Sequence, residues 1–445
     1  MIEESKNSDI TEEINMLLDE GKEKPIKDYF SSLGLPDQTY LIDHLPKDKK
    51  IQVFSLLTIK EKAELIPEVN EYSLEILIRA LDADTLSKIA DSLEIDEAVD
   101  LIGEVREHRR DTVLNKSERA EHIRALLRFG PDTAAGIMTL DFLSLNGEDS
   151  VKTAQEKLRE IREQEEFKYI YIIDNKGNLA GYVTPWTILT SSPEKILKDL
   201  VKPIYSVPAD LDQEEVIPIF ADYDLLQVPV VDEFGKLIGV ITVDDAIDVM
   251  EEEATEDIQY LGGLRNIESV FFPPRRSFAS RIPWLYIKLA TALLAALVVG
   301  YFEDVLQAFI GAAIFMPVVA AMGGSAGTQT LSIIVRAIAL GEVRYQDVKG
   351  LLWKEIVVGL FTGIAIGLGT SLIAFLWKGN PMFGLVVGLA LILNHLAAAL
   401  FGVLLPVFLD RMDIDPALTS NLFLTTITDV FGFFALLGLT KIILT

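Results

Sequence analysis

Two kinds of hydrophobic pattern divide the chain. Long apolar runs begin near Pro283, and five of them approach or exceed the roughly 20 residues that cross a bilayer as a helix. Before these runs, apolar positions follow the shorter periods of amphipathic helices and of strands. The pattern therefore predicts a soluble part followed by a membrane bundle, with spans at Trp284–Phe302, Val305–Met322, Leu351–Trp377, Phe383–Leu409 and Leu418–Leu444.

An internal repeat lies in the soluble part. Residues 169–184 align with residues 227–242, and each copy reads as a strand, an Asp-x-x-Gly turn and a second strand. This repeat resembles a tandem pair of CBS domains, which we expect at 136–200 and 201–250. Residues 1–135 predict an all-helical domain whose short amphipathic helices stack as a superhelical scaffold.

The CBS resemblance implies a nucleotide site. CBS pairs often bind adenine nucleotides through a Thr-x-x-Asp element after the second strand. The second copy retains this element as Thr242 and Asp245, whereas the first copy has Thr187 where Asp is expected. We therefore expect at most one site for a nucleotide such as ATP.

Charge is divided along the chain in the same way. The formal net charge is −27, yet 50% of the residues are hydrophobic. The segment from Phe271 to Thr445 contains 11 basic and 9 acidic residues, so the excess negative charge lies in the first part of the chain. An acidic surface argues against nucleic-acid binding and fits a part that meets cations. The absence of cysteine excludes disulfides, thiolate metal sites and cysteine catalysis.

Acidic residues are densest between Asp244 and Asp257, just before the membrane part. A solvated helix face is the usual meaning of such a run. Like charges four residues apart, as at Asp248 and Glu252, nevertheless destabilise a bare helix, and divalent cations would relieve that repulsion. We expect a linking helix at 251–275 that couples the cytosolic ion level to a pore in the five-helix domain at 276–445.

Basic residues indicate the orientation of the spans. The N-terminus lacks the pattern of a signal peptide. Lys and Arg gather before the first span, between the second and third, and between the fourth and fifth, which places these segments inside. The prediction is a multi-pass protein in the lipid of the inner (cytoplasmic) membrane, with a cytosolic N-terminus and an external C-terminus.

Two features inside the spans carry candidate chemistry. Asp429 lies in the middle of the fifth span, with Asn421 two turns earlier, and a carboxylate there is either a pore group or a protonated, hydrogen-bonded side chain. The glycine-rich segment Met322–Thr330 either unwinds to present carbonyl oxygens or packs closely against another helix. Oxygen ligands without cysteine favour a hard cation. Mg2+ gives up its water reluctantly, and one carboxylate per chain is too few to remove that water. A pore for Mg2+ would therefore pass the hydrated ion and use carboxylates from two or more chains.

The order of a helical domain, a CBS pair, an acidic helix and five spans resembles the MgtE-type magnesium channels. The resemblance covers nearly the whole chain. Ser325 departs from it, because many members have Asn at that position. The motifs that carry it are Pro283-Trp284-Leu285, Gly323 to Gln329, Asp415-Pro416-Ala417, Thr428 to Gly432, Asp212 to Glu215, Ala221 to Asp224 and Ala254 to Asp257.

The resemblance implies a homodimer with one pore, in which Asp429 of each chain holds hydrated Mg2+ and Asn421 and Thr425 line the pore. The acidic helix would act as a plug that closes when internal Mg2+ bridges acidic groups. No obligate protein partner is implied. The implied regulatory ligands are Asp212, Glu214, Asp224, Asp245, Asp248, Glu253, Glu256 and Asp257, with Glu64, Asp96 and Asp100 from the helical domain.

Two alternatives remain open. The transported ion could instead be Mn2+, Co2+ or Ca2+, since oxygen ligands accept several divalent cations. The protein could also be a membrane-anchored nucleotide sensor whose spans only anchor it. An enzyme is not expected, because the sequence contains no nucleophile–base set, P-loop or metal-ligand triad.

Overall fold

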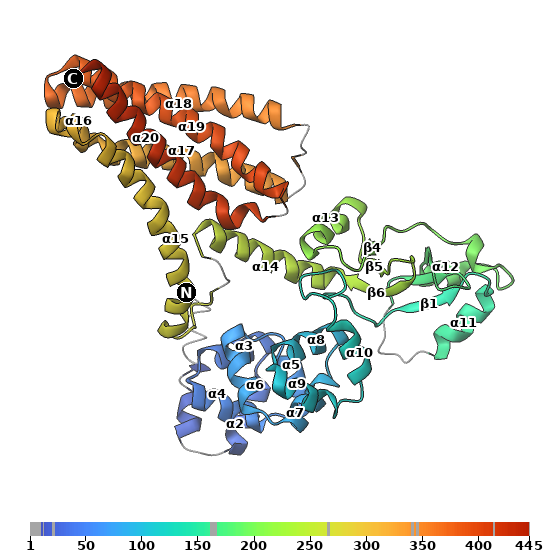
Figure 1. The fold of residues 1–445 in the computed structure, drawn as a ribbon. Coiled ribbons are helices and arrows are strands. Elements are labelled where there is room, and N and C mark those ends of the chain that lie inside the picture. Colours follow the sequence, from blue (N-terminus) through green and yellow to red (C-terminus); the bar gives the residue numbers. More distant parts are fainter. Residues whose placement is uncertain are drawn as a thin grey trace. The chain divides into compact units, whose positions relative to one another are not determined.

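A computed structural model describes residues 10–11, 13–19, 23–160, 167–264, 268–339, 342–343, 347–412 and 414–444. These residues form two compact units, Met1–Glu251 and Glu252–Thr445. The first unit carries short helices and two small sheets, and the second consists of long helices (Figure 1).

The first unit begins with short helices that share one apolar core. Their starts are fixed by side-chain caps where the sequence offers them: Asn70 accepts from the Ser73 amide, and Asp82 accepts from the amides of Asp84 and Thr85. The described helices are α2 (Glu23–Ser32), α3 (Leu35–His44), α4 (Lys47–Leu56), α5 (Ile59–Leu65), α6 (Glu71–Ala80), α7 (Ala83–Ala90), α8 (Ile95–Glu104), α9 (Glu107–Leu114) and α10 (Ala120–Leu126).

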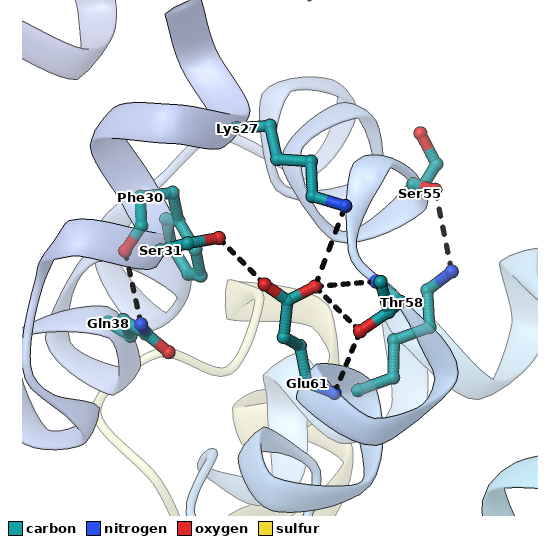
Figure 2. Close-up of polar contacts among 8 residues, drawn as sticks. Lys27, Phe30, Ser31, Gln38, Ser55, Thr58 and Glu61 are labelled. Atoms are coloured by element: carbon teal, nitrogen blue, oxygen red, sulfur yellow. Dashed lines mark hydrogen bonds and ion pairs between the residues drawn. The ribbon is translucent and has the colours of Figure 1, made fainter. Parts of the chain in front are cut away.

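A helix cap with several side-chain partners lies at the start of α5. Thr58 and Glu61 form a capping box, in which the Glu61 carboxylate accepts from the Thr58 amide at 2.7 Å and the Thr58 hydroxyl accepts from the Glu61 amide at 3.3 Å. Figure 2 shows the carboxylate also accepting from Ser31 Oγ at 2.8 Å and facing Lys27 Nζ at 3.8 Å. Since Ser31 and Lys27 belong to α2, this one carboxylate ties two helices together.

Glu61→Ala should cost about 1 kcal/mol of unfolding free energy, the usual effect of losing a helix cap. The amide of Thr58 and the hydroxyls of Ser31 and Thr58 lower the pKa of Glu61 to about 2. Its stabilisation is therefore complete above the ordinary pKa near 4.5 and disappears as the pH falls towards 2. Chemical denaturation between pH 3 and 7 measures this, with Glu64→Ala, which removes only an exposed ion pair to Lys60, as control. Equal losses in both variants would contradict the assignment.

The two repeat copies fold alike, which confirms the CBS pair. In each copy the first strand is parallel to the second, and the second is antiparallel to the third across the Asp-x-x-Gly turn. The first copy has β1 (Leu143–Asn146), α11 (Val151–Glu160), β2 (Ile170–Ile173), β3 (Leu179–Val183), α12 (Pro185–Thr190) and the 3-10 turn η1 (Leu197–Asp199). The second has β4 (Val207–Pro208), α13 (Gln213–Tyr223), β5 (Gln227–Val231) and β6 (Leu237–Thr242).

The acidic segment is one helix, α14 (Val243–Leu261), which starts directly after β6. It begins earlier than the linking helix expected at 251–275, because residues 243–250 continue the same helical period. The division between the two units falls inside it.

Among the described residues, five helices of the second unit are long and apolar enough to cross a membrane, which confirms the expected number of spans. They are α15 (Pro274–Tyr301), α17 (Gly311–Ala339), α18 (Val348–Lys378), α19 (Pro381–Asp410) and α20 (Pro416–Ile443), with the short α16 (Glu303–Ala308) between the first two. α19 packs against α17, α18 and α20, and α17 also packs against α20 (Figure 1).

The glycine-rich segment is helical throughout, so the unwinding considered from the sequence is wrong and close packing is correct. A Cβ at Gly323 would lie 2.1 Å from Asn394 Nδ2, and one at Gly327 would lie 3.0 Å from Leu424 Cδ2. These two positions therefore need glycine for close contact with α19 and α20. Gly324 has no such neighbour, because it faces the pocket described next.

Candidate functional site

A pocket of about 730 Å3 lies along α17 and α20, and it contains the predicted pore carboxylate Asp429. Thr425, four residues earlier on α20, also lines it, as helical spacing requires. The remaining lining residues come from α17 and are Ala320, Ala321, Gly324, Ser325, Thr328, Gln329 and Ser332.

Three hydroxyl groups of this pocket are arranged as acceptors. Thr328 Oγ1 donates to the Gly324 carbonyl at 3.0 Å, Ser332 Oγ to the Thr328 carbonyl at 2.9 Å, and Thr425 Oγ1 to the Asn421 carbonyl at 2.8 Å. Each hydroxyl proton is thus engaged by the residue's own helix, and the oxygen lone pairs remain for the pocket. Together with the Asp429 carboxylate, they make a lining suited to a cation or to its water shell.

Asn421 of α20 contacts the C-terminal end of α14 and is not among the residues that line the pocket. Its Nδ2 donates to the Leu261 carbonyl at 2.7 Å, and its Oδ1 is 3.5 Å from Thr328 Oγ1. Tyr260 and Leu261 also pack on the apolar cluster that includes Leu331 and Leu424 of α17 and α20. The last turn of α14 is therefore attached to both helices that line the pocket.

Lys288 of α15 is a basic side chain that acts electrostatically on the Asp429 carboxylate. The sequence places Lys288 within the first span, but only the packing of α15 on α20 brings the two charges into range. The predicted pore carboxylate is thus influenced by a basic side chain on another helix, which the sequence interpretation missed.

A second carboxylate group gathers in the first unit around Asp96, a predicted regulatory ligand. Asp96 is only 8% exposed, and its Oδ1 has no hydrogen-bond partner among the described residues. Burial and the nearby charge of Asp245 raise the pKa of Asp96 to about 8, and Glu94 and Glu97 add to the effect. Asp96 and Asp245 were predicted as ligands, whereas Glu94 and Glu97 were missed because nothing in their local sequence distinguishes them from other surface acids.

Asp245 also belongs to the expected nucleotide element. Its Oδ2 accepts from the Thr242 amide at 3.2 Å and from the Thr242 hydroxyl. Burial raises the pKa of Asp245, although these two hydrogen bonds oppose the effect. In the first copy, Thr187 takes the place of Asp and its hydroxyl lies 2.9 Å from that of Thr184.

A third group joins the C-terminal half of α14 to the start of α20. Burial and the charge of Asp415 raise the pKa of Asp257 to about 6, with a smaller effect from Glu256. Asp415 is the N-cap of α20 and accepts from the Ala417 amide at 2.7 Å. Asp257 and Glu256 were predicted as ligands, while Asp415 was noted only as part of a motif. Burial of two like charges beside each other is the physical reason to expect a cation here.

The other predicted ligands have separate local positions. Asp212 caps the start of α13 by accepting from the Glu214 amide at 2.9 Å, and Asp224 ends that helix with a left-handed φ of 51°. Glu64 pairs with Lys60 at 3.6 Å. Asp100 and Asp248 are exposed, and Glu253 is half-buried on α14. Within the described residues, no three acidic or histidine side chains already stand in a metal-binding arrangement.

The raised pKa of Asp96 has a measurable consequence. Between about pH 4 and 8, Asp96 holds a proton in the folded protein and releases it in the unfolded chain. The free energy of unfolding of the metal-free protein should therefore fall as the pH rises through this range. Asp96→Asn should remove that slope and, at pH 8 without divalent ions, stabilise by about 1–3 kcal/mol. Thermal unfolding of the full chain with a chelator measures both effects, and the exposed Asp111→Asn is the control. An unchanged slope in Asp96→Asn would refute the assignment.

Comparisons with known proteins agree with this organisation. Residues 33–132 match the MgtE intracellular N domain, residues 134–194 and 197–252 the CBS domain, and residues 316–439 the MgtE divalent cation transporter model. Magnesium transporter MgtE of Thermus thermophilus is 32% identical and covers 96% of this chain and 97% of its own. Magnesium transporter MgtE of Bacillus subtilis is 26% identical and covers 99% and 98%.

A solved structure described as the cytosolic domain of the Mg2+ channel MgtE in complex with ATP is 28% identical to this chain. It covers 54% of this chain and 99% of its own length, with a TM-score of 0.49. The near full-length match to the Thermus thermophilus protein, together with the five membrane helices, assigns the family: the chain is a multi-pass membrane protein and belongs to the MgtE family of divalent cation transporters.

Proposed function

We propose that this protein imports Mg2+ across the cytoplasmic membrane through the pocket between α17 and α20. The observation that carries the proposal is the oxygen-rich lining, in which Asp429 is joined by the hydroxyls of Thr328, Ser332 and Thr425, whose protons point into their own helices. The names of the relatives, which are magnesium transporters, support Mg2+ as the ion.

The proposed pore passes a hydrated ion. Mg2+ gives up its water shell reluctantly and usually keeps several waters when proteins bind it through one or two carboxylates. Hydroxyl and carboxylate oxygens within hydrogen-bond distance of those waters would hold the shell. A homodimer would place two copies of Asp429 at one pore and supply the charge that a single chain lacks. Thr425 lines this pore beside Asp429, and Asn421 would act at its cytosolic end.

The proposed regulation uses Mg2+ bound to the cytosolic carboxylates. The unpartnered Asp96 Oδ1 and the crowded negative charges around it fit a cation, with Asp96, Asp245, Glu94 and Glu97 as the side chains available to hold it. Asp257 of α14 and Asp415 at the start of α20 also fit a cation, because their two buried negative charges lie near each other. Glu253, Glu256 and Asp248 are further acidic residues of α14. When Mg2+ is bound, the charge repulsion along α14 is neutralised and its last turn stays on Asn421, which closes the pathway. When Mg2+ is lost, the repulsion loosens α14.

The remaining predicted ligands, Asp212, Glu214, Asp224, Glu64 and Asp100, belong to the same proposal as further acidic positions of the cytosolic part. Membrane orientation follows from the basic loops, with the N-terminus in the cytosol and the C-terminus outside. An adenine nucleotide such as ATP is proposed at Thr242 and Asp245, where it would compete with the regulatory cation for the Asp245 carboxylate.

Complementation tests the proposal. Expression of the chain in a host that lacks its own Mg2+ uptake should restore growth in low-Mg2+ medium, while Mn2+, Co2+ or Ca2+ uptake should not increase. Accumulation of one of those ions instead of Mg2+ would favour the alternative that the protein transports another divalent cation. ATP binding by the purified chain without any ion flux would favour the anchored nucleotide sensor.

A further inference from the structure

Asn394, in the middle of α19, occupies a junction of three membrane helices. It is fully buried, and its Nδ2 donates to the Val319 carbonyl of α17 at 2.9 Å. On one side the amide meets Gly323 of α17, where a Cβ would lie 2.1 Å from Nδ2. On the other side it meets Gly432 of α20, where a Cβ would lie 2.6 Å from the same nitrogen. One side chain therefore contacts both helices that line the pocket.

These contacts are next to the pocket-lining residues. Val319 and Gly323 precede Ala320 and Gly324, so the inner face of α17 touches Asn394 while the neighbouring face lines the pocket. Gly432 lies three residues after Asp429, less than one helical turn away. A rotation or displacement of either helix at Asn394 would thus move the oxygen groups of the pocket.

Packing stability alone does not account for an asparagine here. The Asn394 Oδ1 is buried and has no hydrogen-bond partner among the described residues. An unsatisfied buried acceptor is destabilising, and the penalty is larger inside a membrane, where no water can pair with it. The other half of the amide provides a directional bond to one defined carbonyl, which an apolar side chain would not.

We propose that Asn394 is a positioning residue that fixes the separation and rotation of α17 and α20, and thereby the ion discrimination of the pocket between them. It does not touch the ion. Its amide acts as a spacer of fixed size between two glycines and as a hydrogen bond to Val319. This inference rests on the transport function proposed above.

The test compares Asn394→Ala with Val387→Ala in the full-length protein reconstituted in liposomes. Val387 is fully buried two turns earlier on α19 and belongs to the apolar cluster around Phe315 and Phe383. Both variants remove buried volume, but Asn394→Ala also removes the hydrogen bond to Val319 and the amide that fills the space beside Gly323 and Gly432. We expect the ratio of Mg2+ to Ca2+ flux to fall about tenfold in Asn394→Ala, the rate equivalent of one hydrogen bond. In Val387→Ala the ratio should equal that of the unaltered protein, although thermal stability falls.

A second pair of variants, which enlarges Gly432 and then shortens Asn394, keeps the proposal testable if Asn394→Ala alone folds poorly. Gly432→Ala should reduce thermal stability and flux because its new Cβ collides with the amide, and adding Asn394→Ala should recover part of that stability but not the ion ratio. An unchanged ion ratio in Asn394→Ala, or strictly additive losses in the double variant, would overturn the proposal. Absence of Mg2+ flux from the unaltered protein would instead refute the transport function itself.

Discussion

Asp429→Ala should reduce Mg2+ flux by at least about a hundredfold while leaving the folded protein at least as stable. The carboxylate is the acidic group among the residues that line the pocket, so the variant removes the main attraction for a divalent cation. A carboxylate within a membrane span is costly to bury, and its removal should not destabilise the helix bundle.

Flux into liposomes and thermal unfolding measure these two effects on the same preparation. Asp429→Glu, which keeps the charge on a longer side chain, should retain part of the flux. Asp410→Asn, at the exposed end of α19, is the matched control and should conduct normally. Normal flux through Asp429→Ala would remove this pocket from the conduction pathway.

The second large effect is expected at the regulatory carboxylates. In the variant that combines Asp96→Asn with Asp245→Asn, we expect flux to persist at millimolar cytosolic Mg2+, about tenfold above that of the unaltered protein under the same conditions. The neutral amides no longer repel one another, so a bound cation gains nothing by joining the helical domain to the second CBS copy.

Two controls separate this effect from the other roles of these residues. Glu233→Gln removes an exposed charge from the same CBS copy and should close normally. Thr242→Val leaves Asp245 in place but removes its hydroxyl partner, so it should impair nucleotide binding without opening the pathway. Closure of the double variant at the same Mg2+ concentration as the unaltered protein would refute a regulatory site at Asp96.

The sequence predicts most of the architecture because the relevant signals are local. Apolar runs longer than 20 residues require membrane helices, and the repeated strand–turn–strand pattern requires the two sheets. Asp429 and Thr425 could be found in the same way, since four-residue spacing places them on one helix face. These features depend only on the order of residues along one element.

What the sequence could not predict depends on which elements touch. The close packing of Met322–Thr330 depends on Asn394 and Leu424, which fill the space beside Gly323 and Gly327. Asp96 and its sequence neighbours Glu94 and Glu97 are brought near Asp245, which lies more than a hundred residues later in the chain. Lys288 reaches Asp429 only through the packing of α15 on α20. In each case the partner lies in a distant segment, and local periodicity carries no information about it.

The most direct test of the account is divalent-cation flux through the purified, unaltered protein in liposomes, measured at low and at millimolar Mg2+ on the cytosolic face. The account predicts Mg2+ flux at low cytosolic Mg2+, little flux of Ca2+, Mn2+ or Co2+, and closure at millimolar Mg2+. Equal flux of all four ions, or Mg2+ flux that does not respond to cytosolic Mg2+, would contradict it.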